Sequence, residues 1–177
     1  MAARIAAGVM VLAWVAASGV PARAQAVDAT HASMKTTYDV VKGYITKAAA
    51  QIPEDKYTYQ PTKEVRTMGQ LFGHIADASA MICETAAGIK PAGAGGAEKL
   101  ATKAELQKAV AAAFATCDRA LAAITTANAN ETVDLFGMKH SRIGAIAFNS
   151  AHLFEHYGNI VTYMRMNGMV PPSSGGK

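Results

Sequence analysis

Apolar residues recur at steps of three and four over most of the chain, which is the spacing of an amphipathic α-helix, and no alternating strand pattern of any length is found. We expect four helices, at residues 28–51, 67–88, 102–128 and 141–167. The buried stripes of the first two helices are Met34, Tyr38, Val41, Ile45 and Ala48, then Leu71, Ile75, Ala78 and Ile82. Those of the other two are Leu106, Val110, Phe114, Cys117, Leu121 and Ile124, then Ile143, Ile146, Leu153, Tyr157, Ile160 and Met164.

Local signals support these boundaries. Thr67 with Gln70, and Thr102 with Glu105, have the spacing of a capping box at a helix start. Gly168 suits the residue that follows a helix C-terminus. Four amphipathic helices without strands predict an all-α four-helix bundle. The Gly/Ala/Pro-rich connection between the second and third helices is long enough to cross over, so an up-down-up-down order is not assured.

The first 24 residues differ from the rest. Arg4 is followed by an apolar run over residues 5–20, and Ala22 and Ala24 form an Ala-x-Ala site, as in a secretory signal peptide. The run is shorter than the ~20 residues of a membrane span. We therefore expect cleavage after Ala24, one domain over residues 25–172, a disordered tail over residues 173–177, and a secreted or periplasmic location without membrane attachment.

Charge and cysteine content narrow the function classes. The net charge is +4 for the whole chain and falls to +2 once Arg4 and Arg23 leave with the signal. No basic patch with interleaved aromatics is present, so nucleic-acid binding has no support. Export permits a disulfide between Cys83 and Cys117. Both also fit apolar helix faces, and because the sequence leaves the helix register open, the pairing stays undecided.

Three histidines carry the candidate chemistry. His152 and His156 are four residues apart and therefore share one helix face, beside the core stripe of the last helix. His74 lies next to the buried Ile75 of the second helix. Three imidazoles from facing helices could hold one ion and leave a coordination position open, as catalytic metal sites do. Imidazole ligands favour zinc, nickel, copper or iron over magnesium or calcium, and among these we expect zinc or nickel.

Other side chains are weaker candidates. Asp77, one turn after His74, and Glu155, beside His156, could orient an imidazole or act as a general base. Both residue types are also common on solvated helix faces. His31 fits core packing or the mouth of the site, and His140 fits a loop.

Two stretches resemble the DinB-like superfamily, the DinB/YfiT-like metalloenzymes. Residues 54–76 read EDKYTYQPTKEVRTMGQLFGHIA, and residues 151–159, AHLFEHYGN, contain His-x-x-x-His-x-Gly. The resemblance continues through residues 163–172. It implies a four-helix bundle of unusual connectivity, a divalent metal on His74, His152 and His156, and often a homodimer. Relatives include metal-dependent thiol S-transferases and metal-dependent hydrolases.

The export signal separates this chain from thiol transferases, whose low-molecular-weight thiols belong to the cytosol. We therefore expect a metal-dependent hydrolase that uses a metal-activated water on an unknown small molecule. The alternatives are a non-catalytic periplasmic protein that binds metal or a small molecule, and a thiol S-transferase. A haem-binding bundle with His and Met ligands, or a purely structural helical protein, is less consistent with three converging histidines.

Overall fold

The computed structural model describes residues 22–93 and 95–175, with side chains from residue 29 onward. Four long helices form the molecule: α1 (Ala22–Gln51), α2 (Met68–Ala86), α3 (Lys103–Ala123) and α4 (Arg142–Met166). Two short 3-10 helices, η1 (Glu54–Lys56) and η2 (Ala97–Lys99), lie in the connections. The predicted four-helix bundle is confirmed, and no described helix is long and apolar enough to span a bilayer.

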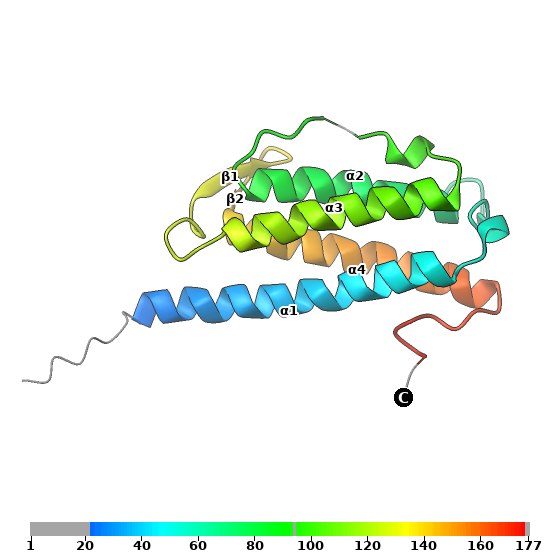
Figure 1. Cartoon of the computed structure of the whole chain (residues 1–177), viewed down its shortest axis with the longest axis horizontal. Coiled ribbons are helices and arrows are strands. Elements are labelled where there is room, and N and C mark those ends of the chain that lie inside the picture. Colours follow the sequence, from blue (N-terminus) through cyan, green and yellow to red (C-terminus); the bar gives the residue numbers. More distant parts are fainter. Residues whose placement is uncertain (1–21, 94, 176–177) are drawn as a thin grey trace, which may run out of the picture.

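The connectivity is not up-down-up-down. The long connection after α2 runs back along the outside of the bundle, so α3 begins at the same end as α2 and the two helices run parallel (Figure 1). η2 lies in this connection. The predicted long crossover is therefore present, and it carries η2 alongside α2.

The capping signals act as predicted. Thr67 and Thr102 each accept the backbone N–H three residues on, and the side chains of Gln70 and Glu105 accept the N–H of the capping threonine in return. At the end of α1, Lys103 donates to the carbonyls of Ala50 and Ile52.

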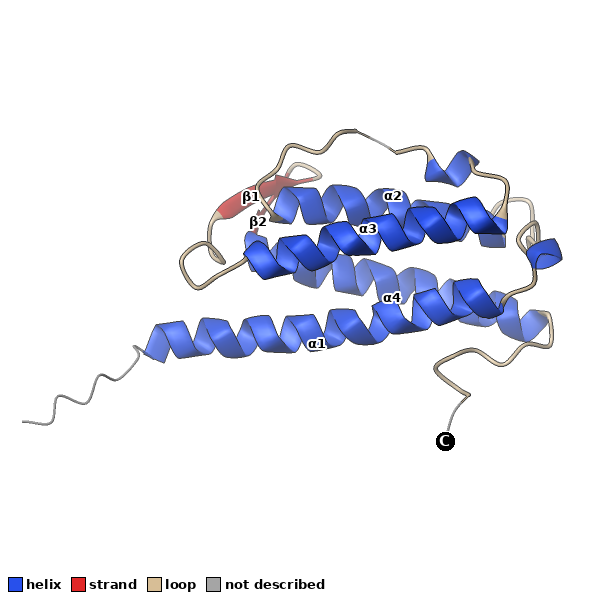
Figure 2. Ribbon diagram, viewed as in Figure 1, coloured by secondary structure: helices blue, strands red, loops and turns tan. Residues whose placement is uncertain are grey.

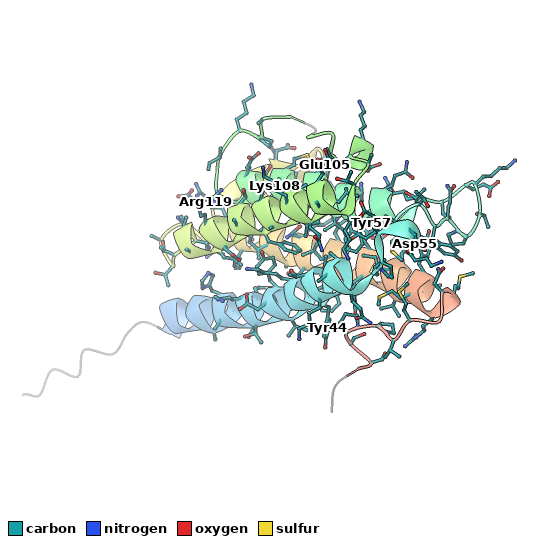
Figure 3. All side chains as sticks on the ribbon, turned by 45° about the vertical axis from the view of Figure 1, so that its right-hand side comes forward. Tyr44, Asp55, Tyr57, Glu105, Lys108 and Arg119 are labelled. Carbon is teal, nitrogen blue, oxygen red and sulfur yellow. A yellow bond between two sulfur atoms is a disulfide. The ribbon has the colours of Figure 1, made fainter. Side chains whose placement is uncertain are left out.

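The apolar stripes meet in one core. Of the side chains predicted to be buried in the four helices, Met34 and Ile143 are partly buried and the others are buried. Figure 3 shows Glu105, Lys108 and Arg119 on the outward face of α3, while Tyr57 lies in the connection after α1. The Tyr57 hydroxyl donates to the carbonyl of Ala49 at 2.7 Å, which fixes this connection to α1.

The expectation that the chain has no strands was wrong. Residues 132–135 (β1, Thr132–Leu135) and 138–141 (β2, Met138–Ser141) form an antiparallel hairpin between α3 and α4 (Figure 2). Each strand has only four residues, too few for an alternating pattern to stand out. The hairpin places His140, expected in a loop, on β2.

The helix ends differ slightly from the predicted ones. α3 ends at Ala123 rather than near Asn128, because the Asn128 side chain accepts from the Thr125 N–H and donates to the Ala123 carbonyl. α1 begins at Ala22, before the predicted residue 28. Most of the predicted signal peptide, residues 1–21, lies outside the described residues. In the predicted tail, Ser173 exchanges hydrogen bonds with Tyr157, and residues 176–177 lie outside the described residues.

Candidate metal centre

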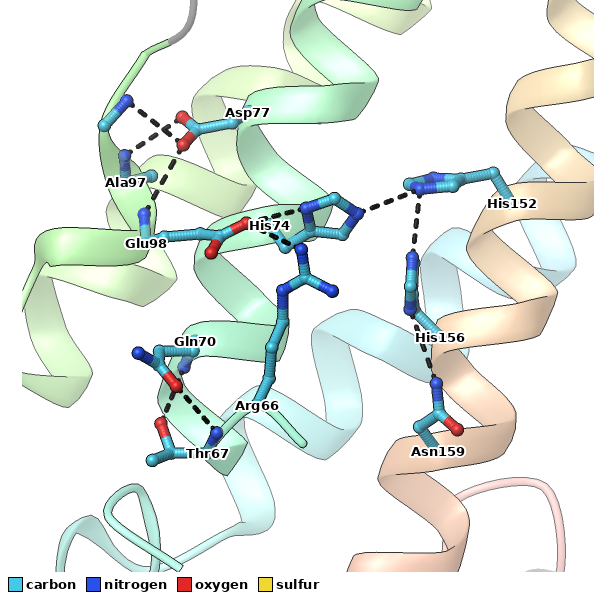
Figure 4. A network of polar contacts seen from close by, with 11 residues as sticks. Arg66, Thr67, Gln70, His74, Asp77, Ala97, Glu98, His152, His156 and Asn159 are labelled. Atoms are coloured by element: carbon cyan, nitrogen blue, oxygen red, sulfur yellow. Dashed lines mark hydrogen bonds and ion pairs between the residues drawn. The ribbon is translucent and has the colours of Figure 1, made fainter. Parts of the chain in front are cut away.

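Three imidazoles converge between α2 and α4 (Figure 4). His152 Nε2 lies 3.2 Å from His74 Nε2 and 3.0 Å from His156 Nε2. One ligand atom from each ring lies within 4.8 Å of the others, so the group could hold a metal ion. The predicted convergence of His74 with the α4 pair is thus present in the structure.

His152 lies between the other two rings, and His74 and His156 each have a partner on the ring nitrogen that faces away from it. His74 Nδ1 lies 2.7 Å from the Glu98 carboxylate on η2, and Arg66 Nη2 approaches the same oxygen at 3.3 Å. His156 Nδ1 lies 3.4 Å from the side-chain amide of Asn159. Such partners hold an imidazole in one orientation, and an acceptor such as the Glu98 carboxylate also fixes the ring proton on Nδ1. Against a carboxylate, His74 carries its proton on Nδ1 and directs the Nε2 lone pair at the other rings.

The connection that carries Glu98 is fixed to α2 by Asp77. The two Asp77 carboxylate oxygens accept the backbone N–H groups of Gly96, Ala97 and Glu98 at 3.0–3.4 Å. Asp77 was a predicted imidazole partner or base, but its oxygens bind this backbone rather than a histidine. Its observed contacts position η2, and through η2 the carboxylate of Glu98.

A glycine permits this close approach. A Cβ on Gly73 would lie 2.5 Å from the Ala97 carbonyl oxygen, a distance that real Cβ atoms do not tolerate. Gly73 immediately precedes His74 on α2. The lack of a side chain at this position therefore lets η2 pack against the helix beside the histidine.

The local environment favours the neutral imidazole at His152 and His156. Burial, and then the charges of His152 and His74, lower the pKa of His156 to about 4. Burial and His74 also lower the pKa of His152. Burial acts to raise the pKa of Glu98, but hydrogen bonds and charges from Arg66 and His74 outweigh it and lower the net pKa. Neutral imidazoles are the form that binds metal ions.

The donor set fits a divalent transition metal. Tetrahedral bonds of 2.0–2.1 Å would separate the ligand nitrogens by about 3.3 Å, close to the two contacts observed. Neutral imidazoles have one N–H each, so direct hydrogen bonds leave lone pairs unsatisfied among the three Nε2 atoms. His152 Nδ1 is also buried without a hydrogen-bond partner. A cation at the point of convergence would satisfy the Nε2 lone pairs.

The histidines lie between two pockets. One, of about 660 Å³, is mostly polar and includes His156, Arg66, Lys63 and Glu155. The other, of about 450 Å³, is more apolar and includes His74, His152, Met81 and Phe136. Glu98 lines both. An ion on the three rings would therefore be reachable by small molecules.

The remaining candidates are now placed. Glu155 is exposed on the wall of the polar pocket beside His156, and it keeps its predicted role as a candidate base. His31 is remote from the group and donates to the Leu121 carbonyl at 3.0 Å. His140 packs its ring against Phe148. Glu98 and Arg66 were not predicted. Glu98 lies 24 positions after His74, and Arg66 lies before α2 begins, so the sequence spacing gives no sign that either side chain returns to the histidine.

The fold and the histidine group define a helical-bundle protein with a candidate metal centre between two helices. The sequence model of the DinB superfamily matches residues 37–160, and the chain belongs to this superfamily. This confirms the resemblance drawn from residues 54–76 and 151–159.

Solved structures show the same fold. A DinB-like protein from Bacillus cereus ATCC 10987 superposes with a TM-score of 0.69 at 16% identity, over 81% of this chain and 95% of that chain. A DinB-like protein from Bacillus subtilis gives a TM-score of 0.63 at 18% identity, over 78% and 93%. Comparison with curated proteins gives no match.

Proposed function

We propose that this is an exported protein that binds a divalent transition metal, zinc or nickel, through His74, His152 and His156, and hydrolyses a small molecule. The convergence of three Nε2 atoms, with Glu98 behind His74, carries the proposal. A bound ion of this kind supplies Lewis acidity and lowers the pKa of a coordinated water. Glu155 lies in the polar pocket, where it could accept a proton from substrate or water.

The proposal also includes export of the protein and its assembly into a homodimer. The N-terminal segment has the sequence of a signal peptide, and a disulfide joins Cys83 and Cys117, as expected in an oxidising compartment. A homodimer remains the expected oligomeric state. The intact mass of protein recovered from the exported fraction tests cleavage after Ala24, and its mass in solution tests the dimer.

The first test is metal content. Untagged protein purified from the exported fraction should contain about one zinc or nickel per chain. Alanine at His74, His152 or His156 should weaken metal binding by more than about 100-fold, beyond the 10–100-fold expected for losing an outer partner. His31→Ala is the matched control, since His31 bonds to a backbone carbonyl outside the group. Unchanged metal binding in all three variants would reject the site.

A second test separates hydrolysis from the alternatives. The metal-loaded protein is assayed on esters and amides, and on electrophiles supplied with a thiol. Hydrolysis that falls in Glu155→Gln and His152→Ala supports the proposal. Turnover only with a thiol would instead identify a thiol S-transferase, and tight metal binding without turnover would identify a non-catalytic binding protein.

A further inference from the structure

The more apolar pocket is suited to a ligand group of its own. Its volume of about 450 Å³ lies within the usual range of small-molecule sites. Ala78 and Met81 of α2 form part of its wall, and His74 and His152 bring two of the three candidate metal ligands to it. A molecule seated here would reach His74 and His152, whereas a molecule in the polar pocket would reach His156.

Phe136 lines this pocket from the turn of the hairpin, and its backbone is unusual. It is the non-glycine residue with positive φ among the described residues, at +55°, followed by Gly137 at +76°. Two consecutive positive φ values in a two-residue hairpin turn are typical of a type I′ turn, which favours Asn, Asp or Gly. A bulky residue in this region is an outlier, because its Cβ crowds the following carbonyl.

Burial of Phe136 in the core does not compensate for this conformation. Its side chain is 58% exposed, and its ring lies beside that of Phe148, with 5.9 Å between centroids. The turn itself is held by the Gly137 N–H, which donates to Asp134 at 2.9 Å. An outlier retained in a held turn beside a candidate site points to a function for the side chain.

We propose that the apolar pocket binds the alkyl or acyl chain of the substrate and that Phe136 is a specificity-determining residue for that chain. The reactive group then lies at the three histidines, and a polar remainder extends into the pocket that contains Arg66 and Lys63. The position of the reactive group rests on the proposed function, whereas the apolar subsite does not require a metal.

The test begins with metal-free protein and a series of n-alkyl alcohols from butanol to octanol. Binding is followed by NMR of the methionine methyl groups, because Met81 lines the pocket and Met138 follows the turn. Affinity should rise about fourfold for each added methylene that is buried. In Phe136→Asn this gain per methylene should be largely lost, with at least a tenfold weaker affinity for octanol.

Protein stability gives a second readout for the same variant. Asn is a favoured residue at this turn position, so the melting temperature of Phe136→Asn should stay the same or rise by a few degrees. Phe154→Asn is the matched control, since Phe154 is an exposed phenylalanine of α4 that lines neither pocket. It should leave the alcohol series unchanged.

A parallel series of n-alkyl hydroxamates on zinc-loaded protein links the subsite to the metal. The same gain per methylene is expected, and acetohydroxamate itself should bind equally to wild type and Phe136→Asn. A gradient with alcohols but no uptake of zinc or nickel would reject the proposed function and leave the subsite standing. Alcohol affinity that does not rise with chain length in the wild type would overturn the subsite. The subsite would also be overturned if the wild type binds no alcohol and its dimer dissociates in Phe136→Asn, because Phe136 would then belong to a dimer interface.

Discussion

At the scale of single residues, Glu98 decides how His74 is presented. Its carboxylate oxygen lies 2.7 Å from His74 Nδ1 and also receives Arg66. A carboxylate in this position fixes the Nδ1 proton and increases the electron density on Nε2. His152, in contrast, has a buried Nδ1 without a partner. The three imidazoles are therefore not equivalent, and His74 is the one whose metal-binding strength a carboxylate adjusts.

We predict that Glu98→Ala lowers metal affinity by about 10–100-fold while leaving all three histidines in place. Glu98→Gln should lose less metal affinity, because its amide oxygen can still accept a hydrogen bond from His74 Nδ1. Some loss should remain, because the amide carries no charge. Metal affinity is measured by competition with a chelator. Glu64→Gln controls for the loss of a carboxylate near the polar pocket, which Glu64 also lines. Equal affinity in Glu98→Ala and wild type would exclude this role for Glu98.

At the scale of elements, the long connection between α2 and α3 matters because it delivers η2 to the histidines. Asp77 holds η2 through three backbone N–H groups, and Gly73 leaves space for the Ala97 carbonyl. Gly73 precedes His74 in α2 and Asp77 follows it, so η2 is held against the helix on both sides of the histidine. The connection is thus a structural part of the site, although its composition is that of a flexible loop.

We predict that Gly73→Ala destabilises the protein by about 1–3 kcal/mol, as overpacking usually does, because η2 must move away from α2. The same movement draws Glu98 from His74, so metal affinity should fall as well. Gly43→Ala is the control, since a Cβ there meets nothing within 4 Å and alanine is the better helix former. Urea denaturation and chelator competition measure the two effects. A Gly73→Ala protein as stable as Gly43→Ala would contradict this packing.

The elements also show what the sequence could predict. Helix periodicity and the two capping boxes identified α1 to α4, because both signals lie within short stretches of chain. The pair His152 and His156 was equally local. Glu98 and the hairpin depend on contacts between distant segments, and a Phe-Gly turn lacks the Asn-Gly signal of a hairpin. The sequence therefore predicted the three converging histidines but missed Glu98, the residue that orients one of them.

At the scale of the whole molecule, the parallel course of α2 and α3 brings Cys83 and Cys117 together. Both sulfurs are buried, and the disulfide lies near the C-terminal part of each helix. The Asn149 side-chain amide of α4 approaches the two sulfurs at 3.5 and 3.6 Å, three residues before His152. One level of the core thus joins α2, α3 and α4, and the disulfide restrains the two helices between which the long connection runs.

We predict that this disulfide contributes about 3–4 kcal/mol to the free energy of unfolding, because it closes a loop of 34 residues in the unfolded chain. Urea denaturation of the wild type with and without a thiol reductant measures this difference on the same side chains. Because both sulfurs are inaccessible, the reductant should act only once the protein unfolds, so native protein keeps the bond for hours.

The double variant Cys83→Ala/Cys117→Ala should lose more free energy of unfolding than reduction does, since it also removes buried sulfur. Metal affinity should persist in the reduced folded state, because the side-chain amide at the two sulfurs belongs to Asn149 and not to one of the three histidines. Equal stability of the oxidised and reduced proteins would show that the bundle alone holds α2 and α3 in register.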